Sequence, residues 1–166
     1  MLRWPLSGLE MNLAGLRLAF EKAVAIEVVA GLAVRVAPVE VVAFLKMVAY
    51  LDRPQERDRD LADIAYILDE YVSASDDRRY SEEVLDVELT YDEISPFLLG
   101  KRLSAIVNEA EKQLILRFIG RVSNAGDPAA GQARMLSVAP PGWRRDPDAL
   151  LLRIMAFERG LGNAVS

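Results

Sequence analysis

The segment 41–50 constrains the fold of this chain more than any other feature of the sequence. Its ten residues are apolar except for Lys46, and Pro38 just before it suits the first turn of a helix. A helix that is apolar on nearly all sides is usually buried. We therefore predict a buried helix from 38 to about 51, terminated by Arg53-Pro54.

A short hairpin is predicted directly before this helix. Apolar side chains alternate along 24–29 and again along 32–37, and Ala30-Gly31 lies between the two segments. Alternation on both sides of a two-residue turn is typical of paired antiparallel strands. Two strands alone are barely stable in water, so we expect the hairpin to pack on neighbouring elements.

The remainder of the first 122 residues is predicted to be largely helical. The spacing of apolar residues and local start signals predict helices at 13–22, 56–71, 82–88, 96–107 and 108–122. Asn108 and Glu111 have the spacing of a capping box, which supports the start of the last of these helices. The predicted class is α+β and mostly helical, with a small antiparallel hairpin near the N-terminus packed on a bundle of about five helices.

Composition divides the chain into three parts. Residues 1–122 form one expected domain, and 123–145 are expected to be a linker because glycine and proline are frequent there. Asp146-Pro147 then starts a C-terminal amphipathic helix within 146–166. The apolar stripe of this helix packs either on its own domain or on a second copy; its members are Leu150, Leu151, Ile154 and Met155.

The residue types that are missing exclude several kinds of chemistry. The 166 residues include no cysteine and no histidine, which excludes disulfides, thiol nucleophiles and imidazole acid–base catalysis. Any metal would have to be a hard cation such as magnesium, held by carboxylates. The net charge of -5 argues against a protein that coats nucleic acid. Without a spanning apolar run or a signal-peptide pattern, we expect a cytoplasmic protein and no membrane partner.

Several segments, taken in order, resemble a known family. They are Leu2-Arg3-Trp4-Pro5, Gly31 to Ala37, Leu45 to Ala49, Asp52-Arg53-Pro54, Arg59 to Asp63 and Phe97-Leu98-Leu99-Gly100. Over roughly 1–122 the chain is similar to bacterial nucleotidyltransferases related to the abortive-infection toxins of type IV toxin–antitoxin systems. This resemblance implies a truncated nucleotidyltransferase-like architecture and the C-terminal region of such a domain.

The metal-binding motif of that family is not found in this sequence. In the family, a Gly-Ser turn precedes an Asp-x-Asp strand, whose two carboxylates project from the same side and hold magnesium with the nucleotide. The chain has no Gly-Ser dipeptide, and its Asp-x-Asp strings at 58–60 and 146–148 lie in a predicted helix and at a predicted helix cap. We therefore predict no metal site, with magnesium and a nucleoside triphosphate bound only if a complete active site is supplied.

The resemblance carries over one group of candidate site residues. It implies Lys46 and Asp60 as catalytic residues, and Arg53, Arg59 and Asp63 as nucleotide-binding residues. Independently, Lys46 is the single charge of an apolar helix and needs a carboxylate, for which Asp60 on the next antiparallel helix is suited. A structural ion pair, a lysine that extends to water and a remnant nucleotide site are the three interpretations.

Two functions follow as hypotheses. The first is a nucleotidyltransferase-like protein that is inactive alone, as a relic or a fragment, with an antitoxin or a missing N-terminal half as its partner. The second is a dimerisation or interaction module without catalysis, which associates through open sheet edges and the last helix. We expect a homodimer, and no nucleic-acid binding without the front half.

Overall fold

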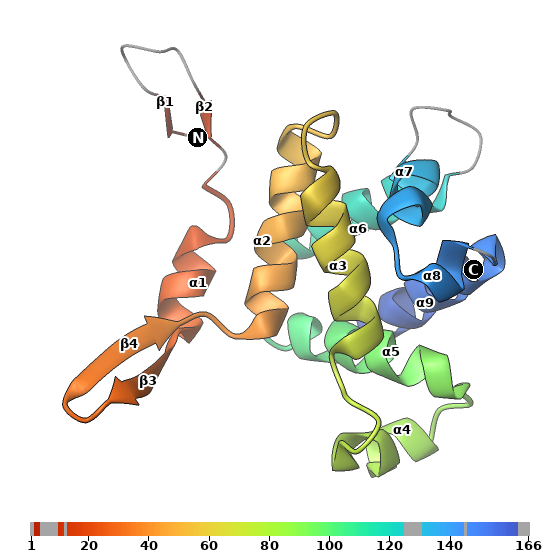
Figure 1. The fold of residues 1–166 in the computed structure, drawn as a ribbon, viewed down its shortest axis with the longest axis horizontal. Helices are drawn as coiled ribbons and strands as arrows, with labels where there is room; N and C mark the ends of the chain where they lie inside the picture. The colour runs from red at the N-terminus through yellow and green to blue at the C-terminus, as the bar shows by residue number, and fades with distance from the viewer. Residues whose placement is uncertain (1, 4–9, 12, 125–130, 145, 163–166) are drawn as a thin grey trace.

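The computed structural model describes residues 2–3, 10–11, 13–124, 131–144 and 146–162 (Figure 1). Within them the chain is mostly helical with short antiparallel strand pairs, which confirms the predicted α+β class. The helices are α1 (Leu16–Lys22), α2 (Val39–Asp52), α3 (Asp58–Glu70), α4 (Glu82–Leu85), α5 (Tyr91–Ser104), α6 (Glu109–Ser123), α7 (Gly131–Val138), α8 (Pro141–Arg144) and α9 (Pro147–Gly160). None of these helices has the length and apolar character needed to cross a lipid bilayer.

Helix α2 lies at the centre of the core, as its apolar sequence predicts. It packs along α3 and also contacts α1, α5 and α6 (Figure 1). Its side chains Phe44, Met47 and Tyr50 are almost completely buried. Burial of such a side chain contributes about 1.5–3 kcal/mol, so α2 supplies much of the hydrophobic stabilisation.

Helices α5 and α6 begin with capping boxes, of which only the one at α6 was predicted from the sequence. Asn108 and Glu111 form the predicted capping box of α6. The expected helix at 96–107 instead begins at Tyr91, where Thr90 and Glu93 form a second capping box. Pro96 therefore lies inside α5 rather than at its first turn, which is why the proline was misleading as a start signal.

Helices α5 and α9 cross in close contact at two glycines. A β-carbon at Gly100 would meet the backbone carbonyl of Phe157, and one at Gly160 would meet the carbonyl of Phe97. Each helix thus brings a glycine against the other helix's backbone, an arrangement that permits Cα–H···O contacts. The C-terminal helix consequently packs on its own domain, which answers one of the alternatives left open by the sequence.

The segment 123–145 differs from the expected linker. Helices α7 and α8 occupy much of it, and Met135 and Trp143 are buried in the main core. Glycine and proline here mark short connections between helices rather than a chain without structure. Residues 125–130 and 145 of this segment, and 163–166 of the last expected part, lie outside the described residues.

The predicted hairpin is present, with β3 (Val24–Val29) paired to β4 (Leu32–Val36). Gly31 occupies the turn with φ 81°, a conformation that glycine adopts without strain. The expected packing on the bundle is wrong, because every residue of both strands is exposed. Figure 1 shows the hairpin extending from the end of α1, beside the helices. A second strand pair, β1 (Leu2–Arg3) and β2 (Glu10–Met11), was not expected.

Candidate functional site

The helices α2 and α3 bring together three of the predicted site residues. Lys46 extends from α2, and its Nζ donates hydrogen bonds to Asp60 Oδ1 at 3.2 Å and to Asp63 Oδ2 at 2.5 Å. The two aspartates are three residues apart on α3, so their side chains share the helix face that α2 covers. Asp60 was the expected partner of Lys46, and Asp63 is a second one.

The charges of this cluster are balanced. Arg57 Nη1 lies 3.6 Å from Asp60 Oδ2, which gives two cations for two carboxylates. Burial lowers the pKa of Lys46, but hydrogen bonds from its ammonium to Asp63 and Asp60, with their charges, raise it overall. Lys46 is therefore a charged ammonium that is hydrogen-bonded to both nearby carboxylates.

Arg53 and Arg59 occupy different surroundings from this cluster. Arg53 Nη1 lies 3.9 Å from Glu56 Oε2, a long ion pair between neighbouring residues of the connection from α2 to α3. Arg59 is exposed, as its position on the predicted helix indicates. The structure thus groups the lysine with the two aspartates and leaves Arg59 facing solvent.

The two Asp-x-Asp strings have structural partners. Asp58 accepts hydrogen bonds from Arg134 of α7, whereas Asp60 contacts Lys46 on α2, so the pair diverges as predicted for a helix. Asp146 is the N-cap of α9 and accepts from the backbone N–H of Asp148. In the described part of the chain, no three acidic side chains are grouped so that they could hold a metal ion.

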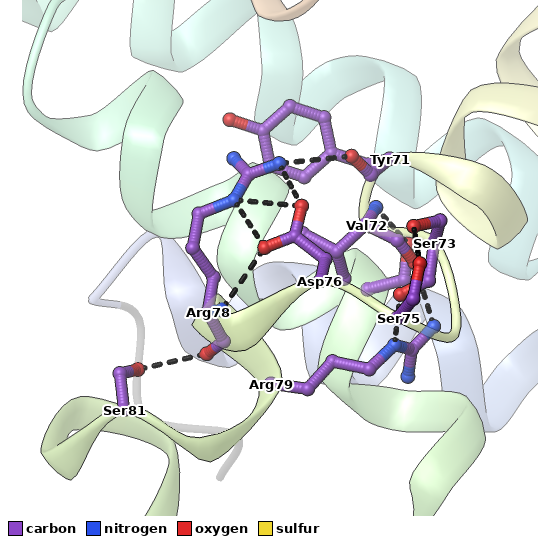
Figure 2. Close-up of polar contacts among 9 residues, drawn as sticks. Tyr71, Val72, Ser73, Ser75, Asp76, Arg78, Arg79 and Ser81 are labelled. Carbon is purple, nitrogen blue, oxygen red and sulfur yellow. Dashed lines mark hydrogen bonds and ion pairs between the residues drawn. The ribbon is translucent and has the colours of Figure 1, made fainter.

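A second polar network fixes the loop between α3 and α4, and the sequence analysis did not identify it. Figure 2 shows Asp76 facing Arg78, whose Nη2 lies 2.7 Å from Asp76 Oδ2, below the ring of Tyr71. The hydrogen bonds from the Arg78 side chain and backbone N–H lower the pKa of Asp76 to about 2. Ser81, the N-cap residue of α4, donates its hydroxyl to the carbonyl of Arg78 rather than capping the helix with its side chain.

The buried Arg79 holds the same loop against α5. Its guanidinium donates to the carbonyls of Val72, Ser73 and Tyr91 and lies over the Tyr91 ring, 4.3 Å from the centroid. Backbone carbonyls accept all of these hydrogen bonds, so Arg79 closes the loop. The sequence offered no signal for these contacts beyond the presence of two arginines in a polar loop.

Arg153 of α9 forms a third polar contact across the bundle. Its Nε lies 3.2 Å from Asp69 Oδ1 and its Nη2 lies 2.9 Å from Asp92 Oδ2. The indole N–H of Trp143 also donates to Asp69, and the guanidinium of Arg153 lies over the Trp143 ring. Beside it is a small cavity of about 140 Å³, lined by Asp69, Glu70, Ala74, Arg79, Tyr91 and Asp92. Arg153 thus binds Asp69 and Asp92 and lies against Trp143, which joins α3, α5, α8 and α9.

The hairpin presents a different kind of surface, formed by apolar side chains. The register pairs Val24 with Val36 and Ile26 with Val34, and alternation places Leu32 on the same face. We call these five residues the apolar face of the hairpin; each is between 41% and 55% exposed. The opposite face carries Glu27 and Arg35. Glu27 accepts from the N–H of Gly31, and Arg35 donates to the carbonyls of Phe20 and Ala23.

The fold and these surfaces define a mostly helical α+β protein. It has a charge-balanced ion-pair cluster between α2 and α3 and an exposed apolar hairpin. No protein-family model, curated protein or solved structure matches the chain. The resemblance to nucleotidyltransferases therefore stays a prediction from the sequence.

Proposed function

We propose that the chain is a protein-association module without catalysis, in which the helices present the β3–β4 hairpin to a protein partner. The observation that carries this proposal is the exposure of the hairpin on both faces. An isolated two-stranded hairpin is marginally stable in water and gains stability when a face or an edge is covered. Exposed contiguous apolar surface of this kind marks interaction sites in soluble proteins.

The Lys46 cluster supports association over catalysis. An ammonium that neutralises phosphate charge needs to be free to approach it, yet Lys46 already donates to Asp60 and Asp63. Freeing it would expose two carboxylates, which repel a nucleotide triphosphate. The cluster is thus best suited to joining α2 to α3, as the structural ion pair among the three interpretations.

The proposal is tested with a variant that changes the exposed surface of the hairpin without changing the helical core. At a protein concentration low enough to keep both proteins monomeric, the variant Ile26→Lys/Val34→Lys, which places two charges on the apolar face, is expected to unfold within roughly 0.5 kcal/mol of the parent chain, because exposed sites contribute little to stability. Urea unfolding followed by circular dichroism measures this difference. A large loss of stability would show that these side chains serve the core, and would contradict an association role.

A nucleotidyltransferase-like function is the second candidate, supported by the contacts of Lys46 with Asp60 and Asp63, three of the residues that the resemblance assigns to the site. In this hypothesis the chain is inactive alone, and magnesium and a nucleoside triphosphate bind only when other residues supply the metal ligands. Isothermal titration calorimetry of the chain with magnesium and each triphosphate distinguishes the two. We expect no heat of binding; micromolar affinity that Lys46→Met abolishes would favour the second candidate over the first.

A further inference from the structure

We infer that the partner of the hairpin is a second copy of this chain, bound through the apolar face formed by Val24, Ile26, Leu32, Val34 and Val36. This inference rests on the proposed association function and names its partner. The two copies would use the same face, related by a two-fold axis, as in most homodimers.

The charges of the hairpin favour a partner that is itself apolar. The apolar face has no charged member, and the two charged residues of the strands, Glu27 and Arg35, are bound within the chain. A charged peptide would therefore find no complementary group on the face. A second copy presents the same uncharged surface, so each face buries the other without an unpaired charge.

The charge of the whole chain favours the same site of contact. The net charge is -5, which opposes the approach of two copies over most surfaces. Residues 24–36 contain one acidic and one basic residue, so the hairpin is locally neutral. Contact through the hairpin brings two copies together where their repulsion is weakest.

The exposed area is sufficient for a small interface. The apolar face, together with Val28 and Val29 at the tip, exposes on the order of 500 Å² of side chain, similar to the largest patches on monomeric proteins. Two such patches bury about 1,000 Å² together, which reaches the lower bound for a specific interface. The strands also carry no lysine or proline, the residues that commonly protect an open edge from pairing.

Light scattering on size-exclusion chromatography tests the inference, with a matched pair of variants. Val34→Lys charges the apolar face, and Ala33→Lys places the same charge on the opposite face, across from Glu27. We expect a mass of twice 18.4 kDa for the parent chain and for Ala33→Lys in the micromolar range, and 18.4 kDa for Val34→Lys. Equal masses for the two variants would overturn the inference.

Single cysteines give a second test that leaves the fold nearly unchanged. Because the chain has no cysteine, a short bismaleimide joins only introduced thiols of two copies. We expect Val34→Cys to form a covalent dimer several-fold faster than Ala33→Cys. Equal rates, or no cross-linked dimer with either variant, would overturn the inference.

The two proposals fail in different ways. If the parent chain has a mass of 18.4 kDa while Ile26→Lys/Val34→Lys retains its stability, another protein covers the face and the second-copy inference is wrong. If that double variant unfolds the chain, the apolar face belongs to the core and the association function itself is wrong. The oligomer measurement and the unfolding measurement therefore report on separate claims.

Discussion

The crossing of α5 and α9 and the β3–β4 hairpin use apolar residues in opposite ways. At the crossing, Phe97 and Phe157 are buried and two glycines let the backbones meet. In the hairpin, a comparable density of valine, isoleucine and leucine is exposed. Hydrophobic content alone therefore does not locate a core. The crossing of α5 and α9 is buried and stabilises the fold, whereas the hairpin is exposed to solvent.

The largest effect is expected at Gly100, where the backbones of α5 and α9 meet. In Gly100→Ala the new methyl group meets the Phe157 carbonyl, and backbone cannot move aside as a flexible side chain can. We expect a loss of about 3 kcal/mol, or a melting midpoint lower by roughly 6–12 °C, in calorimetry. Gly120→Ala on the exposed side of α6 is the control, since nothing lies within 4 Å of its β-carbon. It should stabilise the chain by up to about 1 kcal/mol.

Lys46→Met tests whether the ion pairs between α2 and α3 also contribute to the free energy of unfolding. The variant leaves Asp60, whose side chain is 13% exposed, with only the longer contact to Arg57. We expect a loss of about 1–2 kcal/mol in urea unfolding, with partial recovery in Lys46→Arg.

The pH dependence of Lys46→Met follows from the raised pKa of Lys46. A raised pKa means that the stabilisation is fully present below the ordinary value of 10.5 and is lost as pH rises through the folded value. The loss in Lys46→Met should therefore be equal at pH 6 and pH 9. A loss that changes between these values would contradict the pairing.

Gly31→Ala is the hairpin counterpart of Gly100→Ala and should act locally. Nothing lies within 4 Å of a β-carbon at Gly31, so the cost is the backbone strain of φ 81°, about 1 kcal/mol. We expect faster amide hydrogen exchange in β3 and β4 with little change in the global midpoint. A full shift of the midpoint would show that the hairpin unfolds together with the helices. Gly31→Asn, which tolerates this conformation better, should be milder.

The smallest effect is expected in the loop that Asp76 and Arg78 fix beside the bundle. Because the pKa of Asp76 is lowered to about 2, its contribution is present above the ordinary value of 3.8 and is lost as pH falls through about 2. Asp76→Asn should therefore be slightly less stable than the parent chain at neutral pH, and this difference should shrink as pH falls from about 4 towards 2. Urea midpoints measure it, with exposed Asp77→Asn as the control. A difference that is independent of pH would contradict the ion pair.

Local patterns were sufficient to predict much of the fold. Alternation around Ala30-Gly31 predicted the hairpin but not the register shift between Glu27 and Val29, and the apolar run around Lys46 predicted α2 and its burial. These features depend on neighbours within a few residues, which a sequence displays directly. The hairpin's exposure could not be predicted in this way, because alternation shows which side chains share a face and not what covers that face.

Long-range contacts explain what the sequence analysis missed. Trp143 and Asp69 are 74 positions apart, and no pattern in either segment indicates the other. The burial of Arg153 likewise depends on Asp69, which lies 84 positions away in the sequence. At the candidate site, the contact between Lys46 and Asp60 was predictable because one short turn joins their helices. The contacts of Lys46 with Asp63 and of Asp60 with Arg57, which balance the charges, could be found only from the structure.

Arg35 gives the hairpin a mechanical connection to the rest of the molecule. By donating to the carbonyls of Phe20 and Ala23, it clamps β4 to the C-terminal end of α1. Gly15, at the other end of α1, sits tightly against Phe44 of α2. The hairpin is thus joined through α1 to the central helix α2, by hydrogen bonds at one end of α1 and by close packing at the other.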